Sequence, residues 1–172
     1  MSLNVIKAEA KHTADVIEVA QTCLPQICPD ILEQSDIEAM LSAVYSESAL
    51  DAAIADPEQW FYVMYSDVTF VGFGHLIRKS DDPTVAVLEK LFTRPEFQDY
   101  KSVYKLFQSL VKDSTVQGIT EIEINIPECD KKWIQIFVEI GIEFEPWRKF
   151  ETQFGSKTVT IWPGLLTIIP AF

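Results

Sequence analysis

The stretch LEKLFTRPEFQDYKSVYKLFQSL, from Leu88 to Leu110, predicts a strand that runs through a short turn into a helix. Phosphate groups bind well at such junctions, because the first amides of a helix point outward and its dipole favours an anion. Turns that hold phosphate are usually lined with glycine, which lets the backbone approach the ligand. Between Pro95 and Val103 there is no glycine. The stretch therefore predicts an anion-binding junction that lacks its usual residues.

Composition and charge restrict the classes of function. The 172 residues are 48% hydrophobic and 12% aromatic, which is enough for one domain with a substantial core. The formal charge of −12 is spread along the chain. Nucleic acid is not an expected partner, because its binding needs clustered Lys and Arg. A negative field is compatible with a cationic substrate such as an amine.

The cysteines and histidines give little sign of a metal site or a disulfide. Cys23, Cys28 and Cys129 are odd in number and form no Cys-x-x-Cys pair, so we expect neither a disulfide framework nor a bound metal. Cys23 and Cys28 fall in an apolar helical segment and are expected to be buried thiols. With a polar N-terminus unlike a signal peptide, this predicts a cytoplasmic protein that does not bind membranes.

Hydrophobic periodicity predicts a single α/β domain over residues 1–172. The final hairpin turns at Gly155, where glycine suits the first central position of a type II′ turn. The apolar segment 161–172 is too short to span a bilayer; we expect it to cover the sheet or to form a homodimer contact. Before the hairpin we expect strands at 3–8, 60–65, 69–79, 84–92 and 121–126, and helices at 13–25, from 35, at 46–56, up to 116 and at 131–140.

Three segments of this order match known motifs. Residues 88–98, LEKLFTRPEFQ, follow the pattern Leu-x-x-Leu-Tyr-Val-x-Pro-x-x-Gln. Residues 130–144, DKKWIQIFVEIGIEF, run in step with Asn-x-x-Ala-Ile-x-Phe-Tyr-Glu-Lys-Leu-Gly-Phe, and residues 56–76 look like the second and third strands of the same pattern. In these segments the chain resembles the GNAT superfamily of acetyl-CoA-dependent N-acyltransferases. The resemblance covers roughly Asn4 to Thr160.

The resemblance implies a fold, a cofactor and a class of acceptor. The implied fold is a mixed, mostly antiparallel central sheet flanked by helices, with a C-terminal hairpin. Acetyl-CoA, or another acyl-CoA, is the implied co-substrate, a small-molecule amine or peptide amine is the implied acceptor, and no metal is implied. Carried onto this chain, the segment that binds the cofactor comprises Leu91, Phe92, Thr93, Gln98, Asp99, Tyr100, Lys101, Ser102 and Val103.

Several positions that carry the family's chemistry are altered in this chain. In the loop pattern Gln/Arg-x-x-Gly-x-Gly/Ala, Lys101 and Val103 take the two glycine places. Asp99 would repel a diphosphate by roughly 3 kcal/mol at ~5 Å and an effective dielectric of about 20, and Lys101 would offset most of that repulsion. Asp130 takes the Asn place. Phe137 replaces the Tyr whose hydroxyl commonly protonates the departing thiolate.

Acyl transfer to an amine needs a base for the amine and a proton for the departing thiolate. Glu89 is the expected base, because the family's fourth strand supplies one near the thioester. Water or Tyr104, one position past Val103, is the expected substitute for the missing acid. Two hypotheses remain open at this point. The chain is an N-acyltransferase with an atypical cofactor loop, or it is a non-catalytic binding or regulatory module in which Asp99 or Ser102 caps the helix and shuts the site.

Overall fold

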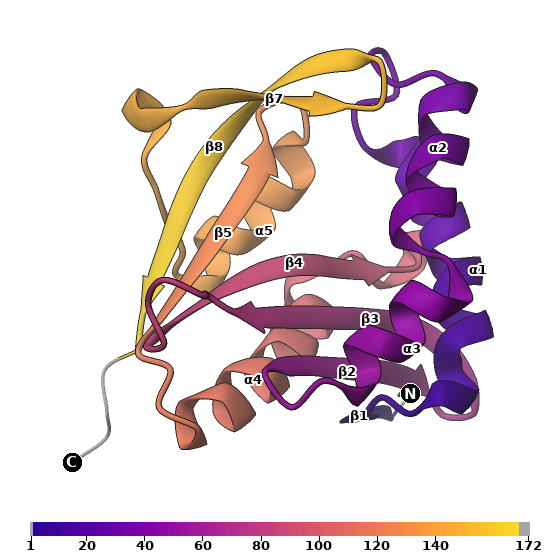
Figure 1. Ribbon diagram of the computed structural model, residues 1–172, viewed down its shortest axis with the longest axis vertical. Helices are drawn as coiled ribbons and strands as arrows, with labels where there is room; N and C mark the ends of the chain where they lie inside the picture. The colour runs from indigo at the N-terminus through magenta and orange to yellow at the C-terminus, as the bar shows by residue number, and fades with distance from the viewer. Residues whose placement is uncertain (1, 169–172) are drawn as a thin grey trace.

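Eight strands form one mixed sheet in the computed structural model, which describes residues 2–168 (Figure 1). The sheet order is β1-β2-β3-β4-β5-β8-β6, and β7 pairs with β8. Of the described strand pairs, only β4 and β5 run parallel, which confirms the predicted mixed, mostly antiparallel sheet. The strands are β1 (Leu3–Lys7), β2 (Gln59–Ser66), β3 (Thr69–Arg78), β4 (Val85–Thr93), β5 (Glu121–Pro127), β6 (Glu143–Phe144), β7 (Phe150–Phe154) and β8 (Lys157–Thr167).

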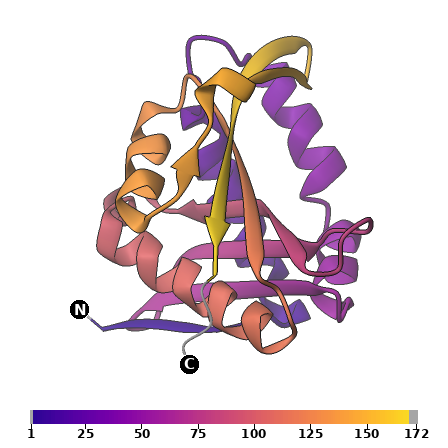
Figure 2. The same cartoon turned by 90° about the vertical axis from the view of Figure 1, so that its left-hand side faces the viewer.

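Helices cover both faces of this sheet, α2 and α3 on one side and α4 and α5 on the other (Figure 2). The α5 limits agree with the sequence-based prediction, because the signals that set them are local. Asp130 caps its first turn, and Gly141 follows its last turn at φ +105. Within residues 2–168 the α-helices are α1 (Thr13–Cys23), α2 (Gln34–Val44), α3 (Glu47–Ala55), α4 (Tyr100–Val116) and α5 (Lys131–Ile140).

A hydrophobic core lies on each face of the sheet. Alternation along β2 sends Trp60 and Met64 into the core beneath α4 and α5, whereas Phe61 and Val63 enter the core beneath α1 to α3. Helix α4 packs close to the sheet, since a Cβ added at Gly74 would lie 2.6 Å from a methyl group of a leucine on α4. This packing holds the middle of α4 against β3.

The two halves of the sheet separate at its centre. Strands β4 and β5 pair only from Val85 to Leu88 and from Glu121 to Ile124. Beyond that point β5 continues along β8 as far as Pro127, while β4 continues along β3 to Thr93. The strands therefore diverge, as Figure 1 shows, and no strand among residues 2–168 covers the edge of β4 beyond Leu88.

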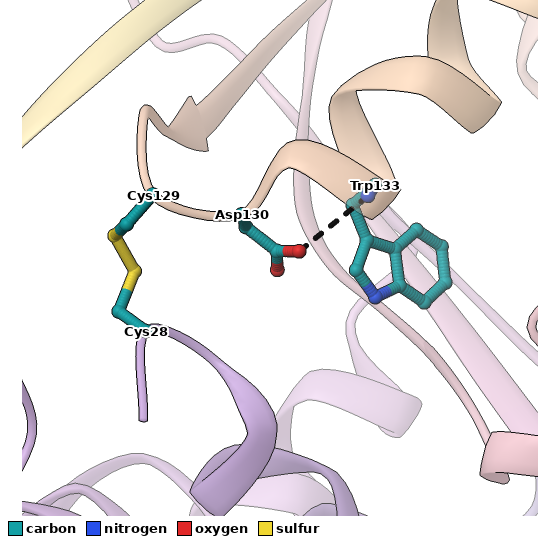
Figure 3. The surroundings of a disulfide bond; sticks show 4 residues. All are labelled: Cys28, Cys129, Asp130 and Trp133. Carbon is teal, nitrogen blue, oxygen red and sulfur yellow. Dashed lines mark hydrogen bonds between the residues drawn. A yellow bond between two sulfur atoms is a disulfide. The ribbon is translucent and has the colours of Figure 1, made fainter. Parts of the chain in front are cut away.

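Cys28 and Cys129 form a disulfide between segments that are 101 residues apart (Figure 3). The bond joins the connection between α1 and α2 to the turn between β5 and α5. The prediction that Cys28 is a thiol and that the chain has no disulfide is therefore wrong. Cys23 is a free, buried thiol, as expected. Because disulfides are typical of oxidising compartments, the cysteines no longer support the predicted cytoplasmic location.

The apolar C-terminal segment is largely a strand. Residues 161–167 continue β8 and pair with β5 along its length, so the expected tail is reduced to the last few residues, of which 169–172 lie outside the described part of the chain. The predicted homodimer contact through this segment stays a prediction. No helix in residues 2–168 is long and apolar enough to cross a membrane.

We expect the Cys28→Ser/Cys129→Ser variant to lose about 2–4 kcal/mol of unfolding free energy, because a cross-link over a long loop restricts the unfolded chain. Urea unfolding at pH 7 measures this difference. A reducing agent provides the control: it should lower the stability of the wild type to that of the variant and leave the variant unchanged. The cross-link would be contradicted if reducing agent left the unfolding free energy of the wild type unchanged and that free energy were no higher than the variant's.

Candidate functional site

A cavity of about 110 Å³ lies where β4 and β5 separate. We call it the interstrand cleft. Its volume is below the roughly 300–1,000 Å³ of typical small-molecule sites, so it has room for a small group and not for a whole cofactor. Two residues of the predicted cofactor segment, Leu91 and Phe92, belong to its lining. The full lining is Ile27, Leu88, Glu89, Lys90, Leu91, Phe92, Asn125, Ile126, Pro127, Asp130, Trp133, Phe137 and Phe154.

A β-bulge in β4 lies at the point where the strands part. His75 of β3 pairs with Lys90, whereas the next residue, Leu76, pairs with Leu88, so Glu89 has no partner in the ladder. A bulge turns side chains away from the regular alternation of a strand, and Glu89 and Lys90 both line the cleft. Glu89 is exposed. The predicted base thus lies beside the cleft with its carboxylate accessible.

A second cavity, of about 300 Å³, adjoins the cleft. We call it the adjoining pocket. It is bounded by the connection between α1 and α2, by α2 itself, by the end of β4 and by the β7–β8 hairpin. Its polar side chains are those of Tyr45, Glu89, Lys90 and Gln153, and the last of these already donates to Thr158 at 2.9 Å. Both cavities are lined by Ile27, Glu89, Lys90, Phe92 and Phe154.

The Lys90 ammonium group lies against the buried ring of His75. Its Nζ lies 3.5 Å from Nδ1 of His75, and Nε2 of His75 lies 2.6 Å from Oε1 of Gln59. This arrangement suits the tautomer in which Nε2–H donates to Gln59 and Nδ1 accepts from Lys90. Burial lowers the pKa of Lys90, although Glu89 acts in the opposite direction. Burial, aided by the Lys90 charge, lowers the pKa of His75 to about 3, so the ring is neutral.

The side chain of Asp99, the residue just before α4, caps the first turn of the helix. Asp99 Oδ1 accepts from the Ser102 amide at 3.0 Å, and Asp99 Oδ2 accepts from the Ser102 hydroxyl at 2.8 Å. The Val103 amide donates to the Asp99 carbonyl at 3.0 Å. Within the described residues the amides of Tyr100 and Lys101 have no protein acceptor. A carboxylate thus lies at the helix start, where the sequence predicts a bound anion.

A side-chain bridge joins the end of β4 to the start of α5. Gln98 Nε2 donates to the Thr93 carbonyl at 3.2 Å, and Gln98 Oε1 accepts from Lys132 Nζ at 2.9 Å. The thiol of Cys23 donates to the same carbonyl at 3.2 Å. The resemblance places Thr93 in the cofactor segment, and its carbonyl therefore already has protein partners.

Aromatic side chains of α5 close the far wall of the cleft. Trp133 and Phe137 are buried with ring centroids 5.8 Å apart, at places where the motif has Ala and Tyr. The indole occupies volume that an alanine would leave open, and Phe137 has no hydroxyl to donate. Asp130 accepts from the Trp133 amide at 3.4 Å (Figure 3), and burial raises its pKa. Trp133 is not among the site residues predicted from the sequence, although its position at the Ala place of the motif was a usable signal.

Tyr104 is not brought to the cleft. It stacks on Tyr100, with ring centroids 5.4 Å apart, on the exposed side of α4. It lines none of the cavities described above. The reason is helical geometry: successive residues are about 100° apart, so Tyr104 turns outward when Val103 is buried. Of the two predicted catalytic residues, the structure places only Glu89 beside the cleft.

Comparisons with known proteins identify the fold. No family model matches the sequence, and no curated protein matches it. The structure resembles a PaiA N-acetyltransferase from Thermoplasma acidophilum in complex with coenzyme A, with a TM-score of 0.80, 21% identity, and coverage of 95% of this chain and 98% of that one. It also resembles a GCN5-related N-acetyltransferase from Rhodopseudomonas palustris (TM-score 0.76, 14% identity, coverage 98% and 97%). A third similar structure is yncA from Salmonella typhimurium with its cofactor acetyl-CoA (TM-score 0.71, 12% identity, coverage 100% and 97%).

The buried neutral state of His75 predicts a pH-dependent stability. Its pKa is about 3 in the folded protein against 6.5 ordinarily. Since the unfolded chain binds more protons between these values, the unfolding free energy falls as the pH drops from about 6.5 toward 3. Between pH 7 and pH 5 the loss is about 2 kcal/mol. Urea unfolding of the wild type and of His75→Gln at pH 7 and pH 5 checks this. The variant should lack the loss of unfolding free energy that His75 causes. Equal slopes would contradict the assignment.

Proposed function

We propose that this chain, which has the GNAT fold, transfers an acyl group from acetyl-CoA or another acyl-CoA to a primary amine. The observation that carries the proposal is the bulge at Glu89, located where β4 and β5 separate and beside the interstrand cleft. Two similar structures hold coenzyme A or acetyl-CoA. Their shared fold supports the same class of cofactor here.

Glu89 is the proposed general base. Its carboxylate takes a proton from the ammonium form of the acceptor in the adjoining pocket, which leaves a nitrogen lone pair able to attack. Acyl-CoA, when bound, supplies the thioester carbon to which that nitrogen bonds as the carbon–sulfur bond breaks. Phe137 cannot protonate the thiolate. A thiol with an ordinary pKa of about 8.5 is a good leaving group, so water suffices as the proton donor.

We assign the cofactor to residues 91–103. Backbone groups at the open edge of β4 would pair with the pantetheine arm, and the first amides of α4 would hold the diphosphate. For this the Asp99 carboxylate must leave the Ser102 amide. The Gln98 side chain must likewise leave the Thr93 carbonyl. The Gln98 hydrogen bond is worth roughly 1 kcal/mol and the one to the charged Asp99 carboxylate roughly 1.5–3 kcal/mol, so these contacts weaken cofactor binding without preventing it.

A second candidate function is supported by the features that narrow the site. The Asp99 cap, the Gln98 bridge and the bulk of Trp133 all reduce the space for a cofactor. The Cys28–Cys129 disulfide ties together two segments beside it. A non-catalytic binding or regulatory module of the same fold would have these properties. The two candidates differ in whether acyl transfer occurs at all.

Glu89→Gln is expected to lower the rate of acyl transfer by about 10²–10⁴-fold, because the amide cannot take a proton from the amine. Release of free thiol from acetyl-CoA, with a panel of primary amines as acceptors, measures this rate. Glu121→Gln is the matched control, since Glu121 lies on β5 and lines neither the cleft nor the adjoining pocket.

Equal rates in the wild type and both variants would contradict the role of Glu89. If the wild type releases no thiol with any amine, from acetyl-CoA or from longer acyl-CoA donors, the result contradicts the proposed function and favours the second candidate.

A further inference from the structure

The bulge in β4 places two consecutive, oppositely charged side chains in one cavity. In a regular strand, neighbouring side chains point to opposite faces. Because of the bulge, Glu89 and Lys90 both line the adjoining pocket. No ion pair joins either group to the other, or to any other residue between 2 and 168. The pocket therefore presents one carboxylate and one amine side by side, and neither of them is in a direct ion pair.

Lys90 has the stronger need for a partner. Burying an ammonium without a carboxylate is unfavourable, and burial lowers the pKa of this lysine. Its hydrogen-bond neighbour, His75 Nδ1 at 3.5 Å, belongs to a neutral ring. The face of the Tyr45 ring, 5.6 Å from Nζ, adds a weak cation–π contact. A carboxylate on a bound ligand would form a direct ion pair with Lys90 and favour its ammonium form.

The rest of the pocket is apolar. Aromatic rings of Phe92 and Phe154 and aliphatic side chains of Leu24, Ile27 and Met40 form its walls. Its volume of about 300 Å³ lies at the lower end of the range for small-molecule sites. Such a pocket fits a small ligand that combines an apolar body with two opposite charges at one end.

We propose that the acceptor is a zwitterion with an apolar side chain, that is, an apolar α-amino acid or a close analogue. Its carboxylate pairs with Lys90, its ammonium group approaches Glu89, and its side chain packs against the apolar walls. An α-amino acid carries its two charges on one carbon, and the two protein charges lie on adjacent residues whose Cα atoms are about 3.8 Å apart. The use of the amine as an acyl acceptor rests on the proposed function, whereas the binding of the zwitterion does not.

Three matched ligands distinguish a site for a zwitterion from a site for an amine alone or an acid alone. L-phenylalanine carries both charges, phenethylamine lacks the carboxylate, and 3-phenylpropionate lacks the ammonium group. An amine leaves Lys90 without a partner, and an acid does the same to Glu89. Calorimetric titration of the wild type, without acyl-CoA, should show that L-phenylalanine or L-methionine binds at least about tenfold more tightly than either partial analogue.

Lys90→Met is the decisive variant, because it keeps an unbranched side chain of similar length and removes the charge. It should bind L-phenylalanine no more tightly than phenethylamine. Lys149→Met is the matched control, since Lys149 is exposed and lines neither cavity; it should bind like the wild type. Urea unfolding checks that both variants fold, and the ligand series on the wild type stands without them.

Three results would overturn the inference: phenethylamine binding as tightly as the amino acids, unchanged amino-acid affinity in a folded Lys90→Met variant, or no binding by any of these ligands. The outcomes also separate the two proposals. Amino-acid binding without acyl transfer would defeat the proposed function and leave this inference standing. Acyl transfer to simple amines without preference for amino acids would do the reverse.

Discussion

Strands β4 and β5 share a ladder of only four residues each, and the candidate site depends on that short pairing. β5 leaves β4 after Ile124 because it continues along β8, whereas β4 stays with β3. The bulge at Glu89 falls immediately after Leu88, the last β4 residue paired with β5. One local divergence thus produces the open strand edge, the interstrand cleft and the free carboxylate at the same place. The helices on the two faces of the sheet pack on the diverging strands through two separate hydrophobic cores.

Most of the fold could be predicted from the sequence because its signals are local. The alternation of buried Ile122 and Ile124 with polar residues marks β5, and the cap at Asp130 and stop at Gly141 mark α5. The bulge leaves no such signal, since one extra residue in a strand changes neither composition nor hydrophobicity. The resemblance to the family pointed to Glu89. Without a signal for the bulge, the sequence could not show that the Lys90 side chain lies in the same cavity.

Features that depend on distant segments were beyond sequence reasoning. The disulfide pairs Cys28 with Cys129 only because the fold brings two loops together across 101 residues. Gln98 matches the family pattern, but its bridge from the Thr93 carbonyl to Lys132 needs the start of α5 to lie beside the end of β4. Both contacts tie the start of α5, or the turn before it, to a segment that is far away in the sequence.

Under the proposed function, the charge at the start of α4 contributes directly to the affinity for the diphosphate of the cofactor. Asp99 satisfies the Ser102 amide and would oppose a diphosphate at ~5 Å by roughly 3 kcal/mol at an effective dielectric of about 20, a repulsion that Lys101 would offset in large part. Asparagine is an equally good N-cap without the charge. Titration of the wild type and Asp99→Asn with acetyl-CoA by calorimetry is therefore the most direct test. The account predicts measurable binding to the wild type and at least about tenfold tighter binding to the variant; no heat from either protein at millimolar acetyl-CoA would contradict it.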